Sequence, residues 1–204
     1  MSGLSLDHRF VEGEQHAPVL LLLHGTGSSP EDILTLGKEL SPSSPMLAPA
    51  GPVSENGAAR WFRRLAEGVF DVEDVRVRAE QLAEFVLAAR EKYGLTDRRL
   101  VAAGFSNGAN IAAAVTLLRP DVLTEAVLFA AMLPVPDPPS HNLGGSRVYL
   151  SNGRRDPMAP LASSEELVEV LRERDAEVTE HWHHGGHQIT LPGLQAAKAW
   201  LTEP

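Results

Sequence analysis

Short apolar runs alternate along the chain with longer stretches in which apolar residues recur at helical spacing. The run PVLLLLHG (18–25) is almost entirely apolar, which is typical of a strand buried on both faces of a sheet. The segment HRFVEGEQHAPV (8–19) is interpreted as an antiparallel hairpin at the sheet edge. Comparable apolar runs predict further strands over 45–52, 98–104, 125–133, 146–153 and 176–184.

The stretches between these runs carry helix signals. In VEDVRVRAEQLAEFVLAAREKY (72–93), apolar residues such as Val75, Leu82 and Val86 are spaced for one helical face. Gly94 suits the C-terminal stop of that helix. Helices are also predicted over 29–40, 107–120, 160–174 and 191–201.

This alternation predicts an α/β fold with a mostly parallel central sheet and helices on both faces. The length of 204 residues suits one domain, 1–204. The proline-rich segment 133–145 is interpreted as a surface loop, which leaves no room there for a large cap domain. In such a sheet, functional residues gather on loops at the carboxyl ends of the strands.

The segment LVAAGFSNGAN (100–110) places Ser106 between Gly104 and Gly108, after a predicted strand and before a predicted helix. This is the context of a nucleophile elbow, a sharp turn that lifts a serine hydroxyl above the sheet. The two glycines allow the strand and the helix to approach without Cβ clashes. Ser106 is therefore the candidate nucleophile, and the alternative is an ordinary loop serine.

A serine hydroxyl needs a base that takes its proton and an acid that orients the base. In this kind of fold, the acid and then the histidine follow the serine along the chain. Asp156 follows the strand predicted over 146–153, and His187 follows the strand predicted over 176–184. Both therefore fall on carboxyl-end loops. Asp137 is the reserve acid, and the alternative role for Asp156 is to cap the following turn.

The loop after the first buried strand suits an oxyanion hole. It reads His24-Gly25-Thr26-Gly27 and precedes a predicted helix, and its glycines free the backbone. The backbone N–H groups of Thr26 and Asn107 are the expected donors to an oxyanion. His24 is interpreted as a structural residue that shapes this loop rather than as a catalyst.

Four segments, LLLHGTGSSPEDI, GFSNGANIA, SNGRRDPMAP and GGHQI, resemble the phospholipase/carboxylesterase family of the α/β-hydrolase superfamily over nearly the whole chain. RWFRRLAEGVFDVEDV (60–75) is especially similar to bacterial carboxylesterases linked with hydroquinone resistance. The resemblance implies the same three triad residues and the same two oxyanion donors. It also implies that Trp61 and Phe62 lie beside the substrate pocket. Many relatives carry leucine where Thr26 stands, so substrate preference stays open.

Two methionines complete the set of candidate pocket residues. Met132 and Met158 lie near predicted strand ends, where they could line the substrate pocket or pack in the core. Core packing is also the alternative for Trp61 and Phe62.

The histidines His181, His183, His184 and His187 raise the question of a zinc site. Such a site needs three or four convergent ligands. On a strand, His181 and His183 share one face while His184 points to the other, and no HExxH spacing is present. No metal and no other cofactor are expected.

Composition narrows the possible partners and location. A formal net charge of −9 argues against a nucleic-acid partner or an anionic membrane surface. The chain has no cysteine, which excludes disulfides, thiolate metal sites and a cysteine nucleophile. The first residues lack a signal-peptide pattern, and no apolar run approaches the roughly 18 residues of a membrane helix. A cytoplasmic location is expected.

These observations together predict a serine carboxylesterase that hydrolyses small to medium carboxylic esters, with aryl esters and lysophospholipids among the candidates. The expected partner is a small-molecule ester, with no nucleic acid and no membrane, and a homodimer is left open. One alternative is an acyl thioesterase that uses the same triad. The other is a catalytically silent binding module of the same fold.

Overall fold

A seven-stranded sheet forms the centre of the computed structural model, which describes residues 4–203. The strand order is β1-β3-β2-β8-β9-β10-β11, and every neighbouring pair is parallel except β1 with β3. The strands of this sheet are β1 (His8–Val11), β2 (Val19–Leu23), β3 (Met46–Pro49), β8 (Leu100–Phe105), β9 (Glu125–Phe129), β10 (Arg147–Gly153) and β11 (Glu177–His183). The predicted mostly parallel α/β architecture is confirmed.

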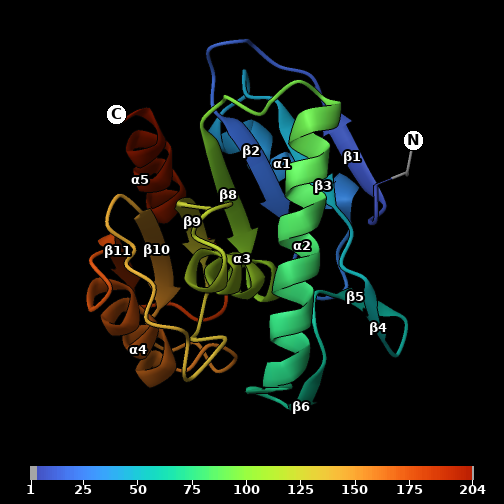
Figure 1. Ribbon diagram of the computed structural model, residues 1–204. Helices are drawn as coiled ribbons and strands as arrows, with labels where there is room; N and C mark the ends of the chain where they lie inside the picture. The colour runs from blue at the N-terminus through green and yellow to red at the C-terminus, as the bar shows by residue number, and fades with distance from the viewer. Residues whose placement is uncertain (1–3, 204) are drawn as a thin grey trace.

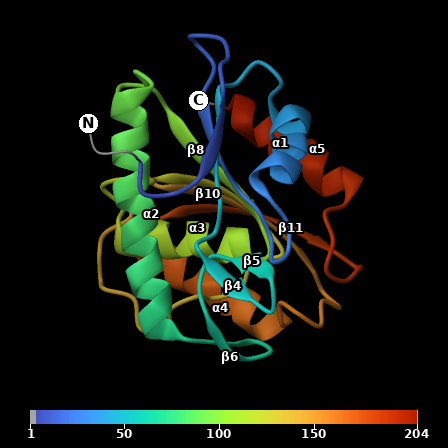
Figure 2. The ribbon, with the colours of Figure 1, turned by 90° about the vertical axis from the view of Figure 1, so that its right-hand side faces the viewer.

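Helices cover both faces of the sheet (Figures 1 and 2). When the molecule is turned by 90°, α1 and α5 lie on one side of the strands and α2 and α3 on the other. The helices are α1 (Pro30–Leu40), α2 (Val72–Lys92), α3 (Asn107–Leu118), α4 (Leu161–Arg172) and α5 (Leu191–Thr202). Two hairpins, made by β4 (Val53–Glu55) with β5 (Ala58–Arg60) and by β6 (Arg64–Ala66) with β7 (Val69–Phe70), fill the segment before α2.

Alternation within the buried strands divides the core into two layers. In β2, Leu21 and Leu23 belong to the cluster that packs against α2, α3 and α4, whereas Leu20 and Leu22 belong to the cluster under α1 and α5. Successive side chains of a strand point to opposite faces of the sheet, and helices cover both faces. All five residues of β2 are therefore buried. The continuous apolar run in the sequence thus reflects helices on both sides of the sheet.

The helix α3 lies unusually close to the strands beneath it. A Cβ added at Gly108 would stand 1.9 Å from the carbonyl oxygen of Leu23, and one added at Gly104 would stand 2.6 Å from the backbone of Gly108. No side chain larger than hydrogen fits at either position. The two glycines flanking Ser106 therefore serve the packing that the sequence predicted for them.

Two local predictions are wrong. The segment 8–19 does not form a hairpin, since β1 pairs antiparallel with β3 and residues 12–18 form no strand. The strand predicted over 125–133 ends at Phe129, because Ala130 has a φ of 54° that breaks extended backbone. The sequence thus predicted an edge strand at β1, but its pairing with β3 depends on the tertiary fold.

Replacement of Gly108 by alanine tests the close packing of α3. We expect Gly108→Ala to lower the free energy of unfolding by about 3 kcal/mol, because the methyl group meets the backbone of Leu23 and cannot be accommodated by a rotamer change. Urea denaturation measures this loss. Gly144→Ala is the control, since its methyl group would meet only the end of the exposed Asn142 side chain. Equal stability of the two variants would contradict the packing argument.

Candidate active site

Ser106 occupies a strained turn between β8 and α3. Its φ of 54° and ψ of −119° lie in a region that residues other than glycine rarely adopt. Its backbone N–H donates to the carbonyl oxygen of Phe129 at 2.8 Å, which ties the turn to the neighbouring strand β9. The conformation directs the serine side chain away from the sheet and toward the loops at its carboxyl edge.

His187 connects Ser106 to Asp156. Its Nε2 lies 2.8 Å from Ser106 Oγ, and its Nδ1 lies 2.7 Å from Asp156 Oδ2. With the carboxylate as acceptor, Nδ1 carries the proton, so Nε2 of the neutral ring is free to accept from the serine hydroxyl. The structure therefore brings these three predicted residues together in one hydrogen-bonded chain.

The carboxylate of Asp156 is held by the backbone around it. Its side chain is fully buried, and Oδ1 accepts hydrogen bonds from the N–H groups of Met158 (2.8 Å) and Ala159 (3.0 Å). Asp156 thus caps the following turn with one oxygen while the other oxygen contacts His187. The reserve acid Asp137 lies exposed in a loop, where Arg76 donates to its carbonyl oxygen.

Two free backbone amides lie beside the serine. Among residues 4–203, neither Thr26 N–H nor Asn107 N–H donates a hydrogen bond to the protein. The loop that carries Thr26 is fixed by its neighbour, because Gly27 N–H donates to Ala59 of β5 at 2.9 Å. Unpaired amides held in this way are suited to receive an oxyanion.

His24 supports this loop from inside the protein. Its ring is buried, with Nδ1 2.8 Å from Gly25 O and Nε2 accepting from Gly51 N–H at 2.9 Å. This pattern requires the neutral ring protonated on Nδ1. Burial lowers the pKa of His24, although the hydrogen bond to Gly25 and the charge of Asp32 oppose the shift. A structural role fits these contacts.

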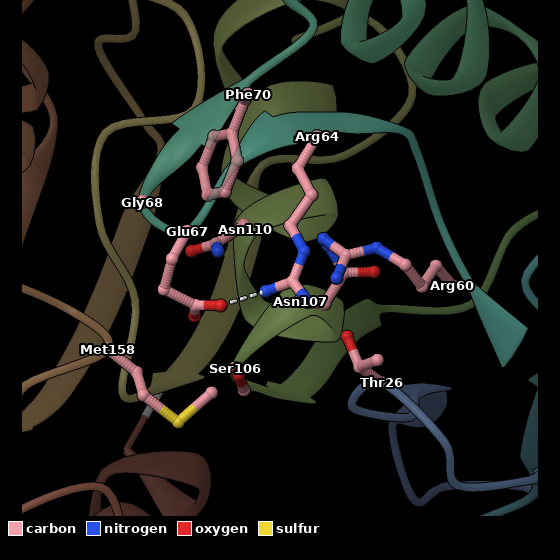
Figure 3. Close-up of a pocket in the computed structure, with 10 residues that line it drawn as sticks. All are labelled: Thr26, Arg60, Arg64, Glu67, Gly68, Phe70, Ser106, Asn107, Asn110 and Met158. Atoms are coloured by element: carbon pink, nitrogen blue, oxygen red, sulfur yellow. Dashed lines mark hydrogen bonds and ion pairs between the residues drawn. The ribbon is translucent and has the colours of Figure 1, made fainter. Parts of the chain in front are cut away.

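Two cavities meet at Ser106. The larger one, about 330 Å³, is mostly apolar and is lined by Phe105, Ile33, Met158 and His187 among others. The smaller one, about 40 Å³, is lined by Asn107 and by the charged Arg60 and Arg64, together with Phe70 and Met158 (Figure 3). Met158 lines both cavities.

The other predicted pocket residues lie elsewhere. Trp61 and Phe62 are fully buried in the core and line neither cavity at Ser106. The indole N–H of Trp61 donates to His24 O, and its backbone N–H donates to Asn107 Oδ1, so Trp61 connects the loop after β2 to the start of α3. Met132 lines a neighbouring cavity that shares Phe70 with the small one.

Sequence reasoning missed four polar residues that line the small cavity: Arg60, Arg64, Glu67 and Asn110. Three of them lie on or beside the two hairpins before α2, a segment without periodic hydrophobicity. One signal was present: Asn56-Gly57 is a turn dipeptide, and its φ values of 52° and 85° suit a tight hairpin.

Within residues 4–203, no group of three or more histidine, aspartate or glutamate side chains converges as metal ligands. His183 Nδ1 instead accepts from Gly185 N–H, and burial lowers the pKa of His183. The described helices include none that is long and apolar enough to cross a membrane.

Comparisons with known proteins place this site in context. The family model described as Phospholipase/Carboxylesterase matches residues 8–203. The MhqD protein of Bacillus subtilis (strain 168), named as a hydrolase, is 40% identical over 185 residues, which are 91% of this chain and 92% of that protein. A carboxylesterase from Bacillus cereus is 41% identical, with a TM-score of 0.93 over 97% of this chain and 93% of the other. A carboxylesterase from Mesorhizobium loti is 26% identical, with a TM-score of 0.92 over 100% of this chain and 98% of the other.

The buried neutral ring of His24 makes stability depend on pH. Its pKa is lower in the folded chain than the usual value near 6.5, so the unfolded state binds more protons as the pH falls. The free energy of unfolding is therefore expected to decrease from about pH 7 to about pH 5. His24→Gln should lower stability at pH 8 and make this slope shallower, whereas replacement of the exposed His16 should leave the slope unchanged. Urea denaturation at graded pH checks this, and an unaltered slope in His24→Gln would contradict it.

Proposed function

Because the chain belongs to the phospholipase/carboxylesterase family and has the α/β-hydrolase fold, we propose that it hydrolyses carboxylic esters with Ser106 as nucleophile. The observation that carries the proposal is the pair of short contacts through which His187 joins Ser106 Oγ to Asp156 Oδ2. A serine hydroxyl hydrogen-bonded to an oriented imidazole is the arrangement that activates serine for attack on a carbonyl carbon.

In the first step, Ser106 Oγ attacks the ester carbonyl carbon while its proton moves to Nε2 of His187. Asp156 stabilises the imidazolium through Nδ1–H and does not take the proton itself. The carbonyl oxygen becomes an oxyanion, which the N–H groups of Thr26 and Asn107 would receive. These amides cost no reorganisation during the reaction, because they are already unpaired and fixed.

Collapse of the tetrahedral intermediate releases the alcohol, which takes the proton from His187 Nε2 and leaves an acyl group on Ser106. In the second step, a water molecule gives its proton to His187 and attacks the acyl carbon. The second tetrahedral intermediate then releases the carboxylic acid and returns the proton to Ser106. The sum is ester plus water giving acid plus alcohol, and no metal or organic cofactor enters it.

The size of the site supports small to medium esters. The larger cavity of about 330 Å³ includes His187, which must protonate the leaving alkoxide, so the alcohol part belongs there. Phe105 and Ile33 give this cavity an apolar wall suited to an aryl or short alkyl alcohol.

Removal of the nucleophile tests the proposal directly. Ser106→Ala should reduce hydrolysis of 4-nitrophenyl acetate by a factor of about 10⁴ or more, because the residual rate comes from binding and the oxyanion hole alone. Circular dichroism and thermal unfolding verify that the variant is folded. The wild-type chain should also react with a fluorophosphonate probe, and the variant should not. A wild-type chain that neither reacts nor turns over esters would identify a silent binding module.

Loss of the charge that orients His187 should also slow the reaction. We expect Asp156→Asn to lower kcat by on the order of 10³-fold or more, since an amide at this position favours the wrong imidazole tautomer. The matched control is Asp137→Asn, which changes an exposed aspartate outside the site and should keep wild-type kcat. Equal activity of the two variants would remove Asp156 from the mechanism.

A further inference from the structure

The small cavity beside Ser106 presents mainly hydrogen-bond donors. Arg60 and Arg64 project into it from the hairpin segment, and Asn107 and Asn110 line it from the first turn of α3 (Figure 3). The carboxylate of Glu67 faces these donors from the opposite rim. A site of this composition is suited to an acceptor-rich, anionic group.

The two arginines lie close together and share one carboxylate. Glu55 accepts from Arg60 Nη1 at 3.1 Å and from Arg64 Nε at 2.9 Å. The side chain of Arg60 is only 4% exposed, and its other hydrogen bond, to Phe62 O, is neutral. Burial lowers the pKa of Arg60 and the charge of Arg64 adds to this shift, although Glu55 opposes it. One carboxylate thus compensates two guanidinium charges at the back of the cavity.

The second negative charge comes from a surface residue. Glu67 stands on the turn between β6 and β7, its side chain is 61% exposed, and it binds Arg64 Nη1 across the cavity. Exposed ion pairs of this kind contribute little stability, so another anion can replace Glu67 at little cost. The Arg64–Glu67 pair lies on the lining of the cavity, whose volume is about 40 Å³.

The side-chain amide of Asn107, a residue that lines the same cavity, has a donor without a hydrogen-bond partner in the part of the chain that the structure describes. The side chain of Asn107 is almost completely buried, and its Oδ1 accepts from Trp61 N–H. Its Nδ2 makes no hydrogen bond within residues 4–203. Since an unpaired buried donor is costly, a bound acceptor at this position would satisfy it.

The position of His187 decides which part of an ester reaches these donors. The alcohol must lie on the side of His187, which lines the larger cavity and not the small one. The acyl chain then extends from Ser106 toward Asn107 and the arginines. This assignment of the two sides rests on the proposed function.

We propose that the acyl part of the preferred substrate carries a carboxylate, as in a half-ester of a short dicarboxylic acid, and that this carboxylate replaces Glu67 at Arg64. Arg60 and the unpaired side-chain Nδ2 of Asn107 complete the hydrogen bonds of this carboxylate. The cavity admits a short acyl chain once the Glu67 side chain swings out to solvent. The apolar alcohol remains in the larger cavity.

A matched pair of esters tests this selectivity. Phenyl hydrogen fumarate and phenyl crotonate have the same rigid trans four-carbon acyl chain, and they end in a carboxylate and in a methyl group. The wild-type chain is expected to favour the fumarate half-ester by at least 10-fold in kcat/KM, after subtraction of the uncatalysed rate. Arg64→Gln should bring this ratio close to that of the uncatalysed reactions. Glu67→Gln should raise the ratio several-fold above that of the wild-type chain, because the Glu67 carboxylate no longer competes for Arg64. Arg63→Gln is the control, since Arg63 pairs with Asp71 outside the small cavity and should keep the wild-type ratio.

The outcomes separate this inference from the proposed function. A lack of hydrolysis of both esters and of 4-nitrophenyl acetate, with Ser106→Ala equal to wild type, would overturn the esterase itself. Hydrolysis of the crotonate as fast as the fumarate, or a ratio unchanged in both Arg64→Gln and Glu67→Gln, would overturn only the carboxylate subsite. If Arg64→Gln does not fold, the exposed Glu67→Gln variant decides alone, because an unchanged ratio there contradicts the displacement.

Discussion

The contact between α3 and the strand ends beneath it governs the geometry of the whole site. The helix backbone at Gly108 approaches Leu23 so closely that only hydrogen fits between them. Because α3 lies so close to the end of β2, the chain must turn sharply at one residue between β8 and α3. Ser106 therefore takes a strained backbone conformation, held by its hydrogen bond to Phe129. Packing of the core stabilises this strain, which places the Ser106 hydroxyl within 2.8 Å of His187 Nε2.

The partners of Ser106 reach it because parallel strands end at a common edge. His187 is 81 residues away in the chain and Asp156 lies 31 residues before His187, yet adjacent contacts of 2.8 and 2.7 Å connect the three. Strands β10 and β11 pair in register up to Gly153 and His183, so the loops that follow them start side by side. The regular geometry of the parallel sheet thus brings together residues that are far apart in the sequence.

The two sides of Ser106 differ in size and chemistry. On the side of His187 the wall is apolar and roomy, whereas on the side of Asn107 it is narrow and rich in donors. Thr26 lines both cavities, whereas Asn107 lines only the small one. The hairpins before α2 supply the polar side, and they also hold the oxyanion loop through the bond from Gly27 to Ala59. The same hairpins therefore support the loop of Thr26 and contribute charged side chains to the small cavity.

Much of this protein can be predicted from local patterns in its sequence. Runs such as 18–25 indicate strands because burial on both faces removes polar positions, and glycines around Ser106 indicate an elbow because no Cβ fits there. The order of Ser106, Asp156 and His187 followed from strand ends. Spacing alone says nothing about which distant surface an aromatic or an arginine meets.

Tertiary packing decided the remaining features. Trp61 lies in the core, where its indole N–H donates to the buried carbonyl oxygen of His24. The two residues are distant in the chain, so local sequence does not reveal this hydrogen bond. Arg60 and Arg64 line the same cavity as the first turn of α3 because two short hairpins carry them there, and those hairpins depend on contacts rather than on periodicity. Local pattern sets the elements and their ends. Which side chains meet across them depends on long-range packing, which no short window of sequence contains.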